Sequence, residues 1–277
     1  MIALDWWIVG LYMGGTLALG IWLARRASGG LVDFFVSGRS LPWWLAGTSM
    51  AATTFSVDTP LYVTGLVARR GIAGNWEWWA FALSHLLLIY LFARLWRRAE
   101  VVTDAELTEL RYGGRPAAVL RGSRAFLFAV PINCIAIGYV MLAMRKVMEA
   151  FDLLGTLPAW LPGDERLWIV VALSVFVMIY AGISGLWGVV ATDFFQFGLA
   201  MLGALLVAGF AIGDIGGLAA LKEGVIAAGR EDALRLVPRP GSPDLPMGTF
   251  LAYLGIQWWA WRRSDGGGEF VQRMSAC

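Results

Sequence analysis

A chain of 277 residues with 58% hydrophobic and only 15% charged residues is far more apolar than soluble domains, in which about a quarter of the residues are charged. A formal net charge of +2, without a basic patch, argues against nucleic-acid binding. The only histidine, His85, excludes a zinc site with two histidine ligands, and the distant Cys134 and Cys277 indicate neither a disulfide framework nor a metal site.

Windows with few or no charged residues predict transmembrane helices along the chain. A helix rises about 1.5 Å per residue and the hydrocarbon core is about 30 Å thick, so roughly 20 apolar residues cross once. The window 167–213, whose only charge is Asp193, must therefore cross twice, and glycines favour a turn at residues 181–185. The sequence thus predicts an all-α polytopic membrane protein of about seven transmembrane helices, at residues 6–24, 40–68, 78–93, 125–144, 167–213 (two crossings) and 245–261.

Tryptophans and arginines indicate where the helices end and on which side. Indole rings prefer the membrane interface, and ten tryptophans lie near the predicted ends: Trp6, Trp7, Trp22, Trp43, Trp44, Trp96, Trp168, Trp187, Trp259 and Trp261. With the N-terminus outside, thirteen of the 22 basic residues fall in cytoplasmic loops, seven of them between the third and fourth helices. We therefore expect a multi-pass protein of the plasma (inner) membrane with its N-terminus outside and the lipid bilayer as its partner.

The second predicted helix contains an unusual polar stretch, SMAATTFSVDTPLYVTG, at residues 49–65. Pro60 has no N–H, so the carbonyl of Ser56 loses its intrahelical partner, and Thr59 is disfavoured in the helical region. A free carbonyl at membrane depth needs protein, water or an ion to satisfy it. The stretch predicts a helix broken at about residues 52–60, as in ion sites of secondary transporters, or alternatively a simple proline kink with hydroxyls bonding back to the helix.

Three acidic residues in apolar surroundings are candidate functional groups. An intramembrane carboxylate costs roughly 2.5–3.5 kcal/mol, so Asp58 should face a cavity or a partner, which favours the broken helix over the kink. Glu77, between tryptophans, is either a pocket acid or an interfacial residue beside an aromatic belt. Asp193 either attracts a cation leaving the pocket or pairs with an arginine of a cytoplasmic loop.

Four collinear stretches of the chain resemble the sodium:solute symporter family, which includes sodium-coupled sugar, proline, pantothenate and iodide carriers. They are DFFVSGRSLPWWLAGTS at residues 33–49, TELRYG at 108–113, the segment 182–196 with GLWGVVATD, and QRMSA at 272–276. The resemblance implies a ten-helix core of two inverted five-helix repeats. Residues 1–39 would be a leading transmembrane helix and cytoplasmic loop, 40–213 the first repeat, 214–244 an external loop, and 245–277 the truncated first helix of the second repeat.

The resemblance also implies roles for individual residues. The sodium-binding positions fall on Ala52, Phe55 and Ser56. The substrate-binding positions fall on Thr54, Asp58, Thr59 and Glu77, and Asp193 aligns with an acid on the ion exit path. In the family, hydroxyls of a later helix complete the sodium site, so we expect this chain to be an incomplete fragment. Residues 258–269 depart from the sugar carriers, which leaves the solute class undetermined.

We therefore expect sodium-coupled secondary active symport of a small organic solute, with sodium as the coupling ion. The alternative is a solute-sensing, transporter-like module of a membrane signalling protein, because some members of the family are fused to signalling domains. An enzyme is not expected, since the sequence shows no nucleophile–base pair, phosphate loop or cluster of metal ligands.

Overall fold

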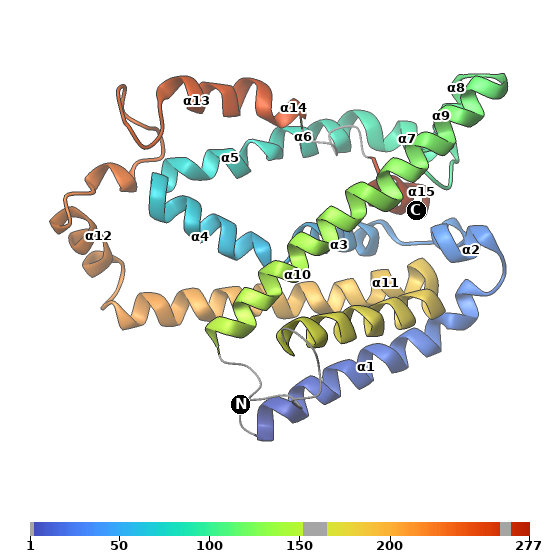
Figure 1. The fold of residues 1–277 in the computed structure, drawn as a ribbon, viewed down its shortest axis with the longest axis horizontal. Coiled ribbons are helices and arrows are strands. Elements are labelled where there is room, and N and C mark those ends of the chain that lie inside the picture. Colours follow the sequence, from blue (N-terminus) through green and yellow to red (C-terminus); the bar gives the residue numbers. More distant parts are fainter. Residues whose placement is uncertain (1–2, 152–164, 261–266) are drawn as a thin grey trace. The chain divides into compact units, whose positions relative to one another are not determined.

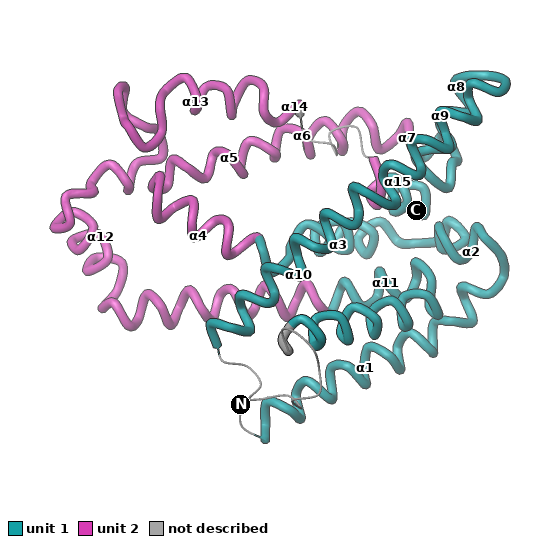
Figure 2. Tube along the Cα trace, in the orientation of Figure 1, with its two compact units in different colours: residues 1–58, 96–195, 271–277 teal, residues 59–95, 196–270 magenta. Residues whose placement is uncertain are grey.

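The computed structural model describes residues 3–151, 165–260 and 267–277, and in these ranges it contains helices and no β-strand (Figure 1). The prediction of an all-α protein is confirmed. The chain forms two compact units, which are considered separately (Figure 2). Unit 1 comprises Met1–Asp58, Trp96–Phe195 and Val271–Cys277, and unit 2 comprises Thr59–Leu95 and Gln196–Phe270.

Four helical stretches of the described residues are long and apolar enough to cross a membrane: Ala3–Ala27, Ile72–Ala99, Gly114–Ala150 and Leu167–Asp214. The last has 48 residues, enough for two crossings. The predicted second helix is present as two shorter pieces, α3 (Trp43–Thr54) and α4 (Asp58–Arg70). The prediction of a polytopic membrane protein is confirmed, and the interruption of the second helix explains why neither piece is long enough to cross alone.

Two of the long stretches are continuous helices that each contain one π-helical turn. The first runs through η2 (Ile72–Asn75), α5 (Trp76–Trp79), α6 (Phe81–Leu87), η3 (Leu88–Phe92) and α7 (Ala93–Ala99). The second runs through α9 (Gly114–Leu127), η4 (Phe128–Ile132) and α10 (Asn133–Ala150), with Pro131 inside the π-turn. The predicted crossing at residues 125–144 lies within this longer helix. Charge-free windows detect only the apolar part of a helix, and α9 begins earlier because arginine is a good helix former.

The stretch α11 (Glu165–Asp214) consists of two helical arms that meet at Gly185, where the chain doubles back (Figure 1). Gly185 has φ 57° and ψ −160°, and a Cβ there would lie 2.8 Å from the Phe34 carbonyl oxygen and 3.0 Å from the Cβ of Ala27. Only glycine tolerates this backbone and this close approach. The turn lies within the predicted residues 181–185.

In unit 1, α1 (Ala3–Ala27) lies against the first arm of α11, since a Cβ on Gly20 would contact Tyr180 and Ser184. The short helix α2 (Leu31–Val36) and the turn η1 (Ser37–Arg39) lead into α3. The unit also contains α8 (Leu107–Arg111) and the C-terminal α15 (Glu269–Ser275), most of which belongs to it. Its apolar core consists of Val36, Leu41, Leu45, Leu186, Val190 and Ala276.

The C-terminal helix α15 is tied to the segment that precedes α3. The Leu41 N–H donates to the Ala276 carbonyl at 2.9 Å, and the Gln272 amide donates to the Phe35 carbonyl at 2.6 Å. Ala276 is completely buried in the apolar core of unit 1. These contacts hold α15 next to the two elements that carry Ser49 and Asp193.

Unit 2 contains most of α4, the helices at 72–95, the second arm of α11, α12 (Leu218–Ala227), η5 (Glu231–Leu234), α13 (Met247–Ala252), η6 (Tyr253–Gln257) and α14 (Trp258–Ala260). Its apolar core consists of Ala73, Ala80, Leu245, Phe250 and Tyr253. Residues 214–244, which the sequence predicts as an external loop between crossings, contain the helix α12 and the short turn η5. The reason is local, because LAALKEGVIA is rich in alanine and leucine, which favour helix.

Candidate functional site

The helix break lies at residues 55–57, within the interval indicated by the sequence. α3 ends at Thr54, Phe55 has the extended values φ −101° and ψ 99°, and α4 begins at Asp58. The Phe55 N–H donates to the Ala52 carbonyl at 3.0 Å, which closes the last turn of α3. A carbonyl oxygen has two lone pairs, so Ala52 retains one acceptor position. The break therefore places backbone oxygens and hydroxyls together in the second predicted transmembrane segment.

The helix begins again differently from the prediction. Thr59 was expected outside the helical region because it precedes a proline, but it belongs to the first turn of α4. Pro60 is in the same first turn, where a backbone N–H has no intrahelical acceptor and its loss costs nothing. The chain therefore breaks before Asp58 rather than at Thr59. The hydroxyls of Thr53 and Thr54 donate back to the carbonyls of Ser49 and Ala51, each at 2.7 Å, as in the alternative interpretation, although the helix is broken.

Asp58 has two hydroxyl partners in unit 1. The Ser56 hydroxyl donates to its Oδ1, and the Tyr139 hydroxyl of α10 also hydrogen-bonds to this carboxylate. The residues from Ala52 to Thr59 are all partly buried. The structure thus brings together the predicted residues of the break and adds Tyr139, which sequence reasoning missed. A tyrosine within a charge-free window was the available signal, because a tyrosine hydroxyl in an apolar segment usually has a hydrogen-bond partner.

Asp193 lies in a second polar group of unit 1, formed with Ser49 of α3 and Arg273 of α15. Arg273 Nη2 is 3.0 Å from Asp193 Oδ2, and its Nε donates to the Ser49 hydroxyl at 2.6 Å. That hydroxyl in turn donates to Asp193 Oδ2. Ser49 is fully buried and Arg273 is 5% exposed. The alternative interpretation paired Asp193 with an arginine of a cytoplasmic loop; the structure shows a pairing with an arginine, and this arginine, Arg273, lies in the helix α15.

Glu77 belongs to unit 2, at the start of α5, and it is surrounded by donors. Arg70 Nη1, from the last turn of α4, is 2.7 Å from Glu77 Oε2, and the Tyr253 hydroxyl donates to the same oxygen at 2.7 Å. The Tyr62 hydroxyl donates to Oε1. The Gln257 amide donates to the Glu77 backbone carbonyl at 3.1 Å. We call these five residues the Glu77 cluster.

The Glu77 cluster is a neutral, preorganised hydrogen-bonding group. Arg70 compensates the carboxylate charge and also donates to the Tyr253 hydroxyl at 2.7 Å. The ring of Tyr62 lies 5.7 Å from that of Trp78, so the cluster has an aromatic side. Glu77 is therefore part of a polar network rather than a lone interfacial acid. The sequence indicated the acid but not its partners, because residues 62, 70, 253 and 257 meet only in the folded chain.

Comparison with known proteins shows which family the chain resembles. The model of the sodium:solute symporter family matches residues 34–257. Sodium/glucose cotransporter 1 of Oryctolagus cuniculus is 27% identical over 223 residues, which cover 80% of this chain and 32% of that protein. The sodium/glucose cotransporter of Vibrio parahaemolyticus is 24% identical over 219 residues, with coverages of 77% and 37%. The chain thus spans about a third of the length of these relatives.

The fold has also been seen in a solved structure, described as the substrate-bound outward-open state of a Na⁺-coupled sialic acid symporter. It superposes with a TM-score of 0.68 at 19% sequence identity, over 98% of this chain and 55% of that one. At this identity the likeness concerns the fold alone. Because the family model matches most of its length, the chain belongs to the sodium:solute symporter family.

Proposed function

We propose that the protein takes part in sodium-coupled symport of a small organic solute across the plasma membrane. The observation that supports this most directly is the helix break at residues 55–57, where partly buried oxygens surround the Asp58 carboxylate. Broken helices at membrane depth supply cation and substrate sites in secondary transporters. Membership of the sodium:solute symporter family and sodium-coupled relatives support the same function. The arginine-rich segments favour a topology with the N-terminus outside.

We assign the sodium ion to the carbonyls of Ala52 and Phe55 and the hydroxyl of Ser56. Sodium is a hard cation, and carbonyl and hydroxyl oxygens are suitable ligands for hard cations. Asp58 adds a negative charge beside the site and holds the Ser56 hydroxyl by a hydrogen bond. The other ligands that sodium requires would come from outside the residues assigned in this chain.

We assign the solute to hydroxyl and carboxylate groups: Thr54, Asp58, Thr59 and Glu77. The acceptors and donors of the Glu77 cluster suit a polar organic molecule, with Trp78 offering an apolar face beside them. Asp193 is assigned to the ion exit path. Because it is paired with Arg273, a cation leaving the site would compete with the guanidinium for this carboxylate.

The sharpest test is sodium binding by the purified protein, because it needs no knowledge of the solute. Binding of ²²Na⁺ is measured in nanodiscs, with choline replacing sodium in the reference sample. We expect saturable binding that Ser56→Ala weakens about tenfold or more, equivalent to at least about 1.4 kcal/mol. Ser174→Ala is the matched control, since the Ser174 hydroxyl donates to the Val170 carbonyl within α11.

Two results would count against the proposal. The first is an absence of saturable ²²Na⁺ binding in the parent protein. The second is equal ²²Na⁺ binding by the Ser56→Ala and Ser174→Ala variants, which would show that the helix break does not form the sodium site. Coupling itself is tested in proteoliposomes with candidate sugars, amino acids and carboxylates, where uptake should require a sodium gradient and disappear in choline.

A further inference from the structure

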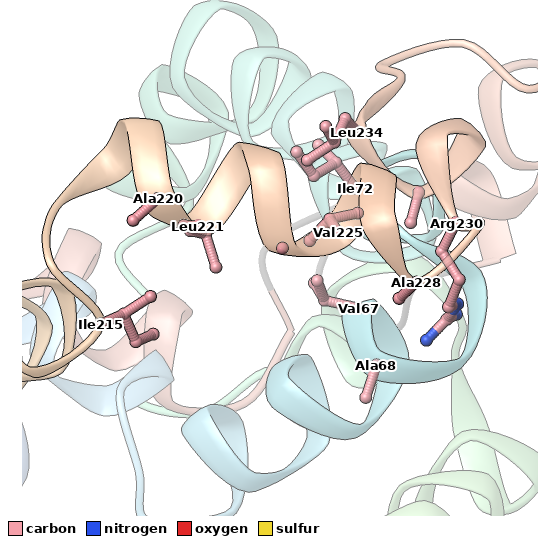
Figure 3. Close-up of a pocket in the computed structure, with 12 residues that line it drawn as sticks. Val67, Ala68, Ile72, Ile215, Ala220, Leu221, Val225, Ala228, Arg230 and Leu234 are labelled. Carbon is pink, nitrogen blue, oxygen red and sulfur yellow. The ribbon is translucent and has the colours of Figure 1, made fainter.

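Unit 2 contains a cavity that none of the groups described above uses. It has a volume of about 470 Å³ and lies between the end of α4, η2, α12 and η5 (Figure 3). This volume is within the roughly 300–1,000 Å³ of typical ligand pockets. Its wall on α12 includes Ala220, Leu221, Gly224 and Val225, which recur at helical spacing and give this helix an apolar face toward the cavity. Ala228, the residue directly after the helix, continues this wall.

The cavity lies next to the ends of membrane-crossing segments. Val67 and Ala68 line it from the last turn of α4, immediately before Arg69 and Arg70. Ile215, the residue directly after the candidate span Leu167–Asp214, also lines the cavity. Segment ends with charged residues mark the depth of the lipid headgroups. The lining residues next to these segment ends therefore place the cavity at the depth of the lipid headgroups.

One charged side chain, Arg230, lines the otherwise apolar cavity (Figure 3). Its Nη2 lies 3.4 Å from the Arg69 carbonyl, and within the described part of the chain it forms no ion pair. The nearby carboxylate of Asp232 is already paired with Arg235 and Arg239, at 3.3 and 2.9 Å. Arg230 therefore offers a guanidinium to an anion at the edge of an apolar chamber, and arginine is well suited to phosphate.

We propose that this cavity binds one acyl chain of an anionic phospholipid from the surrounding bilayer, with the net negative headgroup of the lipid at the Arg230 guanidinium. The apolar face of α12 and the end of α4 contact the chain, and the charge selects the headgroup. This inference does not depend on sodium-coupled transport. A bound lipid would stabilise the packing of α12 against the end of α4. The first residue of α4, Asp58, lies beside the proposed sodium site.

The test uses a photoreactive phosphatidylglycerol that carries a diazirine in its acyl chain, added in trace amounts to the detergent-purified protein. After irradiation and digestion, we expect labelled peptides from residues 67–72 and 215–234. Unlabelled phosphatidylglycerol should suppress this labelling several-fold more effectively than phosphatidylcholine. Labelling elsewhere on the apolar surface should respond equally to both lipids, because annular contacts do not select the headgroup.

Two pairs of variants test the chain site and the charge separately. Gly224→Leu places a bulky side chain in the lining of the cavity, at a position where its Cβ would have no heavy atom within 4 Å. Its control is Ala227→Leu, on an exposed position of α12 outside the lining. Arg230→Gln removes the charge proposed to attract the anionic headgroup, and Arg239→Gln removes an equal charge that already has an acidic partner.

We expect Gly224→Leu to lose most of the specific labelling and Arg230→Gln to lose the preference for phosphatidylglycerol, while both controls behave like the parent. Unchanged labelling in Gly224→Leu would exclude the cavity as the site of the acyl chain. Equal competition by the two lipids in the parent, or an undiminished preference in Arg230→Gln, would exclude the anionic headgroup. Because the readout is lipid attachment, neither result depends on whether the protein binds sodium.

Discussion

Arg273 and Asp193, 80 positions apart in the chain, form an ion pair of 3.0 Å in which the arginine side chain is only 6% exposed. Removal of one partner from such a pair leaves a buried charge and typically costs about 3–5 kcal/mol. We therefore expect Arg273→Ala to lower the unfolding free energy by an amount in this range. The measurement is equilibrium unfolding in mixed micelles, followed by circular dichroism.

The pair Arg121–Glu109 provides the control for this prediction. Its side chains are 42% and 41% exposed, and exposed ion pairs contribute about 0–1 kcal/mol. Arg121→Ala should therefore have little effect on stability. If Arg273→Ala were equally mild, the Ser49–Asp193–Arg273 group would not hold α15 in place, and Asp193 would be available to a cation without competition.

We expect substitution by alanine to have opposite effects on stability at Gly185 and at Gly182. Gly185→Ala forces a side chain into a positive-φ conformation and toward the Phe34 carbonyl, so we expect a loss of about 1–3 kcal/mol or more. Gly182 lies in a helical arm and a Cβ there would meet nothing within 4 Å, so Gly182→Ala should stabilise by about 0.5–1 kcal/mol. Thermal unfolding of the two variants in the same detergent measures this contrast. Similar melting temperatures would refute the turn at Gly185.

The hydrogen bond from Tyr139 to Asp58 predicts a contribution to sodium affinity. Tyr139→Phe removes the hydroxyl that hydrogen-bonds to the Asp58 carboxylate. A hydrogen bond to a charged group contributes roughly 1.5–3 kcal/mol, so ²²Na⁺ affinity should fall about tenfold. Tyr90→Phe, at a position 74% exposed in η3, is the matched control and should bind sodium like the parent. Because both variants keep the aromatic ring, a fall in both would indicate a general effect on packing rather than a role at Asp58.

The sequence was sufficient for the features that depend on local composition. Charge-free windows indicated an all-α membrane protein, since the energetic cost of charge in lipid is a property of each segment alone. The turn at Gly185 and the break near Pro60 followed from the backbone limits of glycine and proline. Thr59 is helical although it precedes a proline, because a first helical turn tolerates proline.

The partners of the candidate residues could not be predicted in the same way. Ser49, Asp193 and Arg273 lie on three elements, and the sequence does not specify which arginine reaches the acid. Tyr139 is one polar residue on an apolar helix, and its approach to Asp58 depends on tertiary packing. The prediction of such pairwise contacts requires the folded structure, whereas hydrophobic patterns can be recognised in the sequence alone.

The Glu77 cluster leads to a prediction about coupling between two charges. Glu77 and Arg70 share a hydrogen-bonded pair whose side chains are 20% and 38% exposed, so its contribution should be smaller than that of a buried pair. In a double-mutant cycle with Glu77→Gln and Arg70→Gln, we expect an interaction energy of about 1 kcal/mol in unfolding free energy. Arg69→Gln, next in the chain and exposed, replaces Arg70→Gln in a control cycle and should be additive with Glu77→Gln.

Glu77→Gln should also weaken solute binding, because the amide offers the solute fewer acceptor sites than the carboxylate. Additivity in the first cycle would show that Arg70 does not hold Glu77 in place, and the acid would then be free to meet the solute directly.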